Sequence, residues 1–206
     1  MGNVFIHVTM SLDGVIARPD DSIDWAFHYG TDHMVQEVME EIGAVVIGNR
    51  GFKEETMNES GLPYGGMVKV PHFVVTHVAR EPVTIGGLTF TFLSGGIQQV
   101  IEAARQAAGS KKVSLLGASI DQQCLKAGLV DEIVIHLVPI VLGEGIRLFD
   151  HVGNESIELE RTEVVTTSQI TSLRFRVTKE KKLTNQDNTE TLKGKNGCPK
   201  KQIERS

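Results

Sequence analysis

The sequence predicts an α/β fold with a mixed, mostly parallel sheet that ends in an antiparallel C-terminal hairpin. Short segments rich in β-branched and aromatic residues alternate with amphipathic segments as far as residue 128, as expected for parallel strands covered by helices. Beyond that point, strand-like segments follow one another directly. The chain has 206 residues, of which 40% are hydrophobic and 23% charged, which is typical of one globular domain.

Five strands are predicted in the first part of the chain. Each is short and consists mainly of residues that favour a pleated, half-buried surface. They are VFIHV (residues 4–8), AVVIG (44–48), HFVVT (72–76), LTFTFL (88–93) and KVSLL (112–116).

Amphipathic segments between these strands predict helices. Apolar residues recur at helical spacing over residues 34–42, with Thr31 as the expected N-cap. The same spacing occurs over residues 97–104 and stops before Gly109, a residue type that commonly terminates helices. In KKVSLLGASIDQQCLKAG (residues 111–128), a strand turns at residues 117–119 and another helix begins.

The C-terminal part predicts three further strands. DEIVIHLVPIVLG (residues 131–143) predicts one long strand, and residues 157–180 predict two strands broken around residues 166–170, which form a hairpin at the sheet edge. From Leu183 onward the sequence is polar, so we expect one domain over residues 1–180 and a disordered polar tail over residues 181–206.

Composition and motifs exclude several function classes. A net charge of −5 argues against a nucleic-acid partner, and the absence of a long apolar run argues against a membrane partner or a secretory signal, so we expect a cytoplasmic protein. The histidines show no metal-ligand spacing, and there is neither a P-loop nor a G-x-S-x-G motif. Of the two cysteines, Cys124 is expected to be a small core residue and Cys198 lies in the tail.

Four segments lie at the carboxyl ends of predicted strands, where α/β proteins bind ligands. They are MSLDGVIA (residues 10–17), IGNRGFKE (47–54), VVTHVAR (74–80) and LLGASIDQQ (115–123).

The turn at residues 117–119 is the candidate phosphate site. Backbone N–H groups are unsatisfied at a helix start, and Gly117 with Ala118 lets an anion approach them, while Ser119 adds a hydroxyl. Alternatively, Gly117 makes only a tight turn and Ser119 caps the helix. The segment alone leaves both interpretations open.

The other segments are equally ambiguous when taken singly. Arg50 presents a planar guanidinium suited to the 2′-phosphate of NADP, and Thr76 ends a strand where its hydroxyl could meet the same group. Asp13 is either a turn residue or a polar contact beside a nicotinamide ring. Trp25 could be a core anchor, and Asp32 could simply match the helix dipole in the first turn of its helix.

Taken together, these segments resemble the dihydrofolate-reductase-like superfamily, and within it the stand-alone relatives of the reductase domain of the bifunctional deaminase-reductase of riboflavin synthesis. The resemblance covers approximately residues 4–178, and AGLVDEIVIHLVPIVLGEGIRLFD (residues 127–150) is its most specific part. It implies a three-layer α/β fold, NADPH bound across the strand ends and a homodimer.

The resemblance also implies roles for individual residues. It places Leu12, Asp13 and Gly14 near the nicotinamide and the substrate. With Asp32 as a further choice for proton supply and Trp25 beside the substrate, the candidate catalytic residues are Asp13 and Asp32, and the candidate substrate contacts are Leu12 and Trp25. The candidate NADPH contacts are Gly14, Gly48, Asn49, Arg50, Thr76, Gly117, Ala118, Ser119 and Ile120.

The expected function is an NADPH-dependent reductase that transfers hydride to a small heterocyclic, carbonyl or imine substrate, similar to the ribosylated-pyrimidine reductase of riboflavin biosynthesis. Dihydrofolate reduction and a non-catalytic nucleotide-binding dimer are the alternatives. Relatives commonly carry Gly-Gly where this chain has Leu116-Gly117, and Asp32 lies seven positions beyond Trp25, farther than in dihydrofolate reductases. The zinc motif of the deaminase half is absent from the sequence.

Overall fold

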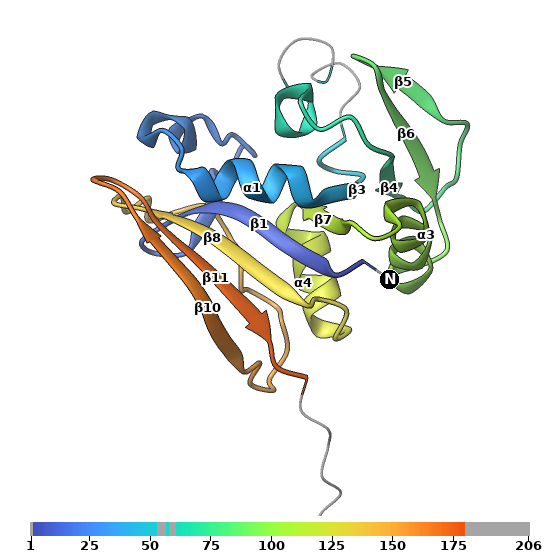
Figure 1. Ribbon diagram of the computed structural model, residues 1–206. Coiled ribbons are helices and arrows are strands. Elements are labelled where there is room, and N and C mark those ends of the chain that lie inside the picture. Colours follow the sequence, from blue (N-terminus) through green and yellow to red (C-terminus); the bar gives the residue numbers. More distant parts are fainter. Residues whose placement is uncertain (1, 53–56, 58–60, 180–206) are drawn as a thin grey trace, which may run out of the picture.

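The computed structural model describes residues 2–52, 57 and 61–179, and it contains one nine-stranded sheet with helices on both faces (Figure 1). The strand order is β10-β11-β8-β1-β7-β3-β4-β6-β5. The pairs from β8 across to β6 are parallel, whereas β10, β11 and β5 run antiparallel to their neighbours. The predicted α/β fold with a mixed sheet and a C-terminal hairpin is therefore confirmed.

The helices and strands have the following bounds. The strands of the sheet are β1 Val4–Ser11, β3 Ile42–Gly48, β4 His72–Val75, β5 Val83–Ile85, β6 Leu88–Leu93, β7 Lys112–Leu116, β8 Glu132–Val138, β10 Leu159–Thr166 and β11 Thr171–Val177. A separate pair is formed by β2 Val15–Ala17 and β9 Ile146–Arg147. The helices are α1 His33–Glu41, α3 Ile97–Ala108 and α4 Ala118–Lys126, with 3-10 helices η1 Asp24–Tyr29 and η2 Pro63–Gly66.

Each face of the sheet has its own hydrophobic core, because strand side chains alternate between the faces. In β1, Phe5 packs with Met34 and Val38 of α1, whereas Val4 and Ile6 belong to the core under α3 and α4. Figure 1 shows α1 on one side of β1 and α4 on the other. The site described below lies where these layers meet the strand ends.

The predicted long strand over residues 131–143 is wrong in its second half. β8 ends at Val138 because Pro139 has no backbone N–H to donate to a neighbouring strand. The chain then runs on beside the end of β1 without regular pairing: Leu12 N donates to Ile140 O at 2.8 Å, and Ile140 N donates to Val138 O at 2.8 Å. β8 lies between β1 and β11, so its apolar run forms no sheet edge for another chain to join.

One predicted helix cap is wrong, and one of the two interpretations of the turn at Gly117 is excluded. Asp32, not Thr31, is the N-cap of α1, and its side chain accepts from Val35 N at 3.2 Å. Gly117 is the N-cap of α4, and no side chain among the described residues caps that helix, so the alternative in which Ser119 caps it does not hold. By contrast, Gly109 ends α3 as predicted.

Some predictions concern residues that the structure does not describe. The boundary at residue 180, the polar tail and Cys198 lie outside the described residues. Cys124 is buried in the core as predicted. Within the described part of the chain, every helix is too short or too polar to cross a membrane.

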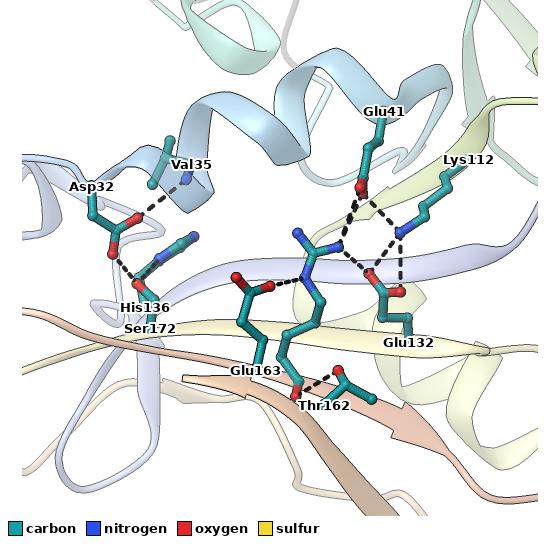
Figure 2. Close-up of polar contacts among 10 residues, drawn as sticks. Asp32, Val35, Glu41, Lys112, Glu132, His136, Thr162, Glu163 and Ser172 are labelled. Atoms are coloured by element: carbon teal, nitrogen blue, oxygen red, sulfur yellow. Dashed lines mark hydrogen bonds and ion pairs between the residues drawn. The ribbon is translucent and has the colours of Figure 1, made fainter. Parts of the chain in front are cut away.

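A cluster of charged side chains ties the C-terminal end of α1 to the sheet (Figure 2). Lys112 of β7 binds Glu41 at 2.8 Å and Glu132 at 2.9 Å. Arg174 of β11 lies 3.2 Å from both of these carboxylates. Burial alone would raise the pKa of Glu41, but the hydrogen bond and charge of Lys112 and Arg174 lower it overall.

Replacing Arg174 by methionine should lower the free energy of unfolding by about 2 kcal/mol, because partly buried carboxylates lose a partner. Arg176→Met is the matched control, since Arg176 pairs with Glu160 on the surface, where the side chains are 66% and 59% exposed. This control should lose less than about 0.5 kcal/mol. Urea denaturation measures both, and equal losses would contradict a stabilising role for the cluster.

Candidate active site

The loops after β3, β4 and β6 meet at the carboxyl edge of the sheet. Asn49 N donates to Val75 O at 3.1 Å, and Thr76 N donates to Leu93 O at 3.0 Å. These bonds join each strand end to the next, so three loops form one continuous surface. The predicted segments around Asn49 and Thr76 therefore lie side by side.

The turn between β7 and α4 leaves open space where an anion would approach. Gly117 has φ 105° and ψ 130°, a conformation that side-chain-bearing residues rarely adopt, and a Cβ there would meet no atom within 4 Å. Gly117 and Ser119 are exposed, while Ala118 and Ile120 are buried. The uncapped N-terminus of α4 thus fits a phosphate group.

The loop after β3 closes against the same helix. A Cβ added to Gly48 would lie 3.2 Å from Ile120 Cγ1, so only glycine fits this close approach without displacement. The structure therefore brings together Gly48 and the turn at Gly117, two of the predicted cofactor contacts.

Cationic and hydroxyl groups follow along this edge. Arg50 is exposed. The Thr76 hydroxyl accepts from Val78 N at 3.3 Å within its own turn. The Arg80 guanidinium lies over the Phe92 ring at 3.9 Å and over the Phe52 ring at 5.5 Å, which holds a positive charge close to the ends of β3 and β6.

Asp13 holds two loops together. Its carboxylate accepts from Ser11 Oγ at 2.7 Å, Leu142 N at 3.1 Å and Gly143 N at 2.8 Å. Arg147 donates to the Asp13 carbonyl, and Gly14 beside it has φ 84°. The bond from Ser11, followed by those from the backbone, lowers the pKa of Asp13 to about 2, so the carboxylate is ionised near neutral pH.

The predicted substrate contacts differ in exposure. Leu12 is 65% exposed at the end of β1. Trp25 is only 2% exposed and packs with Val138 and Ile170. Its surroundings are therefore those of a core residue. Its indole Nε1 is buried without a hydrogen-bond partner among the described residues.

Asp32 lies at the other end of this region, under the start of α1 (Figure 2). It is 8% exposed and accepts a short hydrogen bond from the Ser172 hydroxyl as well as the bond from Val35 N. Ser172 in turn bonds His136 Nδ1 at 2.6 Å, and His136 Nε2 lies 2.8 Å from His7 Nε2. His136 is thus a satisfied strand residue, as expected from its place in the sequence.

The hydrogen-bonded histidines and Ser172 are the residues that sequence reasoning missed as a group. The only available signal is that His7 and His136 interrupt otherwise apolar strands, whereas Ser172 lies in a strand that also contains Thr171, Arg174 and Arg176. That signal does not say that they share a face or a neighbour.

Two surface cavities lie elsewhere. One, of about 510 Å³, is lined by Ile42, Val70 and Lys111 near the amino ends of β3, β4 and β7. The other, of about 720 Å³, is lined by Val130 and Val177 near the amino end of β8. Neither contributes to the carboxyl edge.

Comparison with known proteins decides the family. A family model described as the RibD C-terminal domain matches residues 3–173. The chain belongs to the RibD C-terminal domain family. The resemblance predicted from the sequence is thereby confirmed, together with the three-layer dihydrofolate-reductase-like fold.

The similar proteins and solved structures share a low sequence identity with this chain. The uncharacterized protein YwjB of Bacillus subtilis (strain 168) is 28% identical over 153 residues, which span 73% of this chain and 84% of YwjB. The structure of a candidate riboflavin biosynthesis protein from Shewanella sp. PV-4 has a TM-score of 0.71 at 24% identity, covering 87% of this chain and all of that one. The riboflavin biosynthesis reductase Rib7 of Saccharomyces cerevisiae has a TM-score of 0.58 at 16% identity, covering 86% and 89%.

Proposed function

We propose that the protein is an NADPH-dependent reductase that transfers hydride to a small heterocyclic, carbonyl or imine compound, with ribosylated pyrimidines as the first substrate class to test. The open, uncapped turn at Gly117, in a chain of the RibD C-terminal domain family, is the observation that carries the proposal. The similarity to the reductase Rib7 supports it.

The carboxyl edge offers the groups that NADPH would need. The backbone N–H groups of residues 117–119 would hold the pyrophosphate, with Ile120, whose N–H donates to Gly117 O at 2.9 Å, beside them. Gly48 and Asn49 would border the adenosine. Arg50 and Thr76 would contact the 2′-phosphate, with the positive charge of Arg80 near the same loops. Bound there, NADPH supplies the hydride, while the protein supplies orientation and a defined electrostatic environment.

The substrate would lie between the ends of β1 and β8 and the start of α1. Leu12 offers an exposed apolar contact there, and Trp25 supports the neighbouring wall. Asp13 holds the two loops that border this region and is our candidate for a polar contact with substrate or cofactor. Asp32 is our candidate for proton supply: each of its oxygens retains a further acceptor site, at which the carboxylate would first take up a proton and then pass it to the substrate.

A screen for NADPH oxidation tests this proposal. Pterins, ribosylated pyrimidines and small carbonyl compounds are incubated with the protein and NADPH, and loss of the reduced nicotinamide is followed by absorbance. We expect turnover with at least one ribosylated pyrimidine or other heterocycle. A protein that binds NADPH but oxidises it with no compound of the panel would instead be a non-catalytic binding protein.

We also propose that the protein forms a homodimer, as the resemblance to paired relatives implies. Phe27 and Val141 are 74% and 66% exposed, so apolar surface is available for a second copy. Light scattering at micromolar concentration should give the mass of a dimer. The mass of a monomer would contradict the proposal.

A further inference from the structure

A chain of six polar side chains crosses the sheet beneath α1. It starts at Ser114 of β7 and passes through Tyr64 of η2, His7 of β1, His136 of β8 and Ser172 of β11 to Asp32. The Ser114 hydroxyl lies 2.6 Å from that of Tyr64, which lies 3.3 Å from His7 Nδ1. From His7 the hydrogen bonds continue to His136, then to Ser172, and end at Asp32. Figure 2 shows the end at Asp32.

The strands of the sheet hold four of these six residues in position: His7, Ser114, His136 and Ser172. Ser172 lies directly opposite His136 in the pairing of β11 with β8, and both are almost fully buried. Tyr64 reaches the hydrogen-bonded chain from a backbone conformation with φ 53°, in the left-handed region that residues with a side chain rarely adopt. Its ring stacks on that of His7, with centroids 5.7 Å apart.

Asp32 accepts hydrogen bonds at one end of the series, and this fixes which atom donates in each of the other bonds. Asp32 accepts from both Val35 N and the Ser172 hydroxyl. Because that hydroxyl has used its only proton, His136 Nδ1 must donate to it. If His136 is neutral, its Nε2 must then accept from His7 Nε2, and His7 Nδ1 must accept from Tyr64.

The surroundings favour neutral histidines. Burial lowers the pKa of His7 to about 3, and the neighbouring His136 and the charge of Arg174 act in the same direction. Burial also lowers the pKa of His136, although Asp32 opposes this effect. Both rings are therefore uncharged at neutral pH, with one proton each.

We infer that Asp32 sets the tautomers of His136 and His7 through Ser172, and that His136 and Ser172 are positioning residues which fix the Asp32 carboxylate for the substrate. This inference rests on the proposed function in assigning a substrate to Asp32. The direction of the chain does not depend on that assignment.

The same chain of hydrogen bonds is a poor source of protons for Asp32. A shift of every proton by one place toward Asp32 would leave an oxyanion on Tyr64 or Ser114. Burial raises the pKa of Tyr64 far above its usual value, so such an oxyanion is strongly disfavoured. The chain therefore holds a carboxylate in one orientation and does not deliver protons to it.

Long-range proton–nitrogen NMR spectra of ¹⁵N-histidine-labelled protein test the direction. The wild type should show the proton of His136 on Nδ1 and that of His7 on Nε2. In Asp32→Asn, the new amide oxygen should face Val35 N and the new amide nitrogen should donate to Ser172. Every bond of the chain then reverses, and both histidines should change tautomer.

Asp24→Asn is the matched control, because Asp24 is an exposed aspartate outside the chain. This variant should leave both tautomers as they are in the wild type. A His136 proton on Nε2 in the wild type, or unchanged tautomers in a folded Asp32→Asn protein, would overturn the inference. Neither measurement needs a substrate, so the inference can fail independently of the proposed function.

Turnover tests the positioning role once a substrate is known. Ser172→Ala should lower kcat about tenfold by removing one hydrogen bond to the carboxylate, without changing KM for NADPH. Ser172→Thr, which keeps the hydroxyl, should restore most of the loss. Ser114→Ala removes an equally buried strand hydroxyl at the far end, and an equal loss of kcat in this variant would show that Ser172 has only a structural role.

Discussion

Replacing Gly117 by valine should weaken NADPH binding about a hundredfold, or about 2.7 kcal/mol. A Cβ at this position would meet no atom of the described residues within 4 Å, so it would project into the open space at the start of α4. The backbone N–H groups there could then no longer approach a phosphate closely. Titration calorimetry with NADPH measures the effect.

Gly128→Val is the control for backbone strain. Gly128 also has a positive φ, of 66°, and open space around it, but it follows the other end of α4. Both variants should lose stability, whereas only Gly117→Val should lose NADPH affinity. Equal affinity in Gly117→Val and the wild type would mean that this turn does not hold the pyrophosphate.

Asp121, in the first turn of the same helix, makes the stability depend on pH. It is fully buried, and neither carboxylate oxygen has a hydrogen-bond partner among the described residues. Burial raises its pKa from 3.8 to about 8. Asp121 is therefore mostly protonated at neutral pH and adds little negative charge behind the candidate phosphate turn.

The sign of this effect follows from proton binding. Between pH 3.8 and about 8 the unfolded chain releases the Asp121 proton while the folded protein keeps it, so stability falls as pH rises. His7, with a folded pKa of about 3 and an ordinary value of 6.5, acts in the opposite direction below pH 6.5. The effect of Asp121 is therefore clearest above pH 6.5.

We expect the wild type to lose about 2 kcal/mol of unfolding free energy between about pH 6.5 and about pH 8. Asp121→Asn cannot titrate, so its stability should stay level over this range and exceed that of the wild type at the upper end. Urea denaturation at both pH values measures the difference. Parallel pH profiles for the two proteins would show that Asp121 is ionised in the folded state.

The strand, turn and helix around Gly117 could be predicted because their signals are local. KVSLL has the composition of a buried strand, and the following glycine and amphipathic run mark a turn and a helix. The same reasoning extended β8 too far, since the apolar run continues past Pro139 and composition alone does not show where the strand ends. The N-cap of α1 was misplaced by one residue because Thr31 and Asp32 are both good caps.

The buried polar chain could not be predicted, because it depends on tertiary pairing. His7 and His136 are separated by 129 positions and meet only when β1 and β8 pair in the observed register. Ser172 joins them through a third strand. The sequence indicates that the two histidines interrupt apolar strands, but only the fold shows that they and Ser172 face one another.

Titration of NADPH and NADH into the wild-type protein tests the central claim most directly. NADPH should bind at sub-millimolar concentration and more tightly than NADH, because Arg50 and Thr76 are expected to contact the 2′-phosphate. Equal affinity for both would remove that role from Arg50 and Thr76. Failure of both to bind at sub-millimolar concentration would contradict the proposal that this protein is a nicotinamide-dependent reductase.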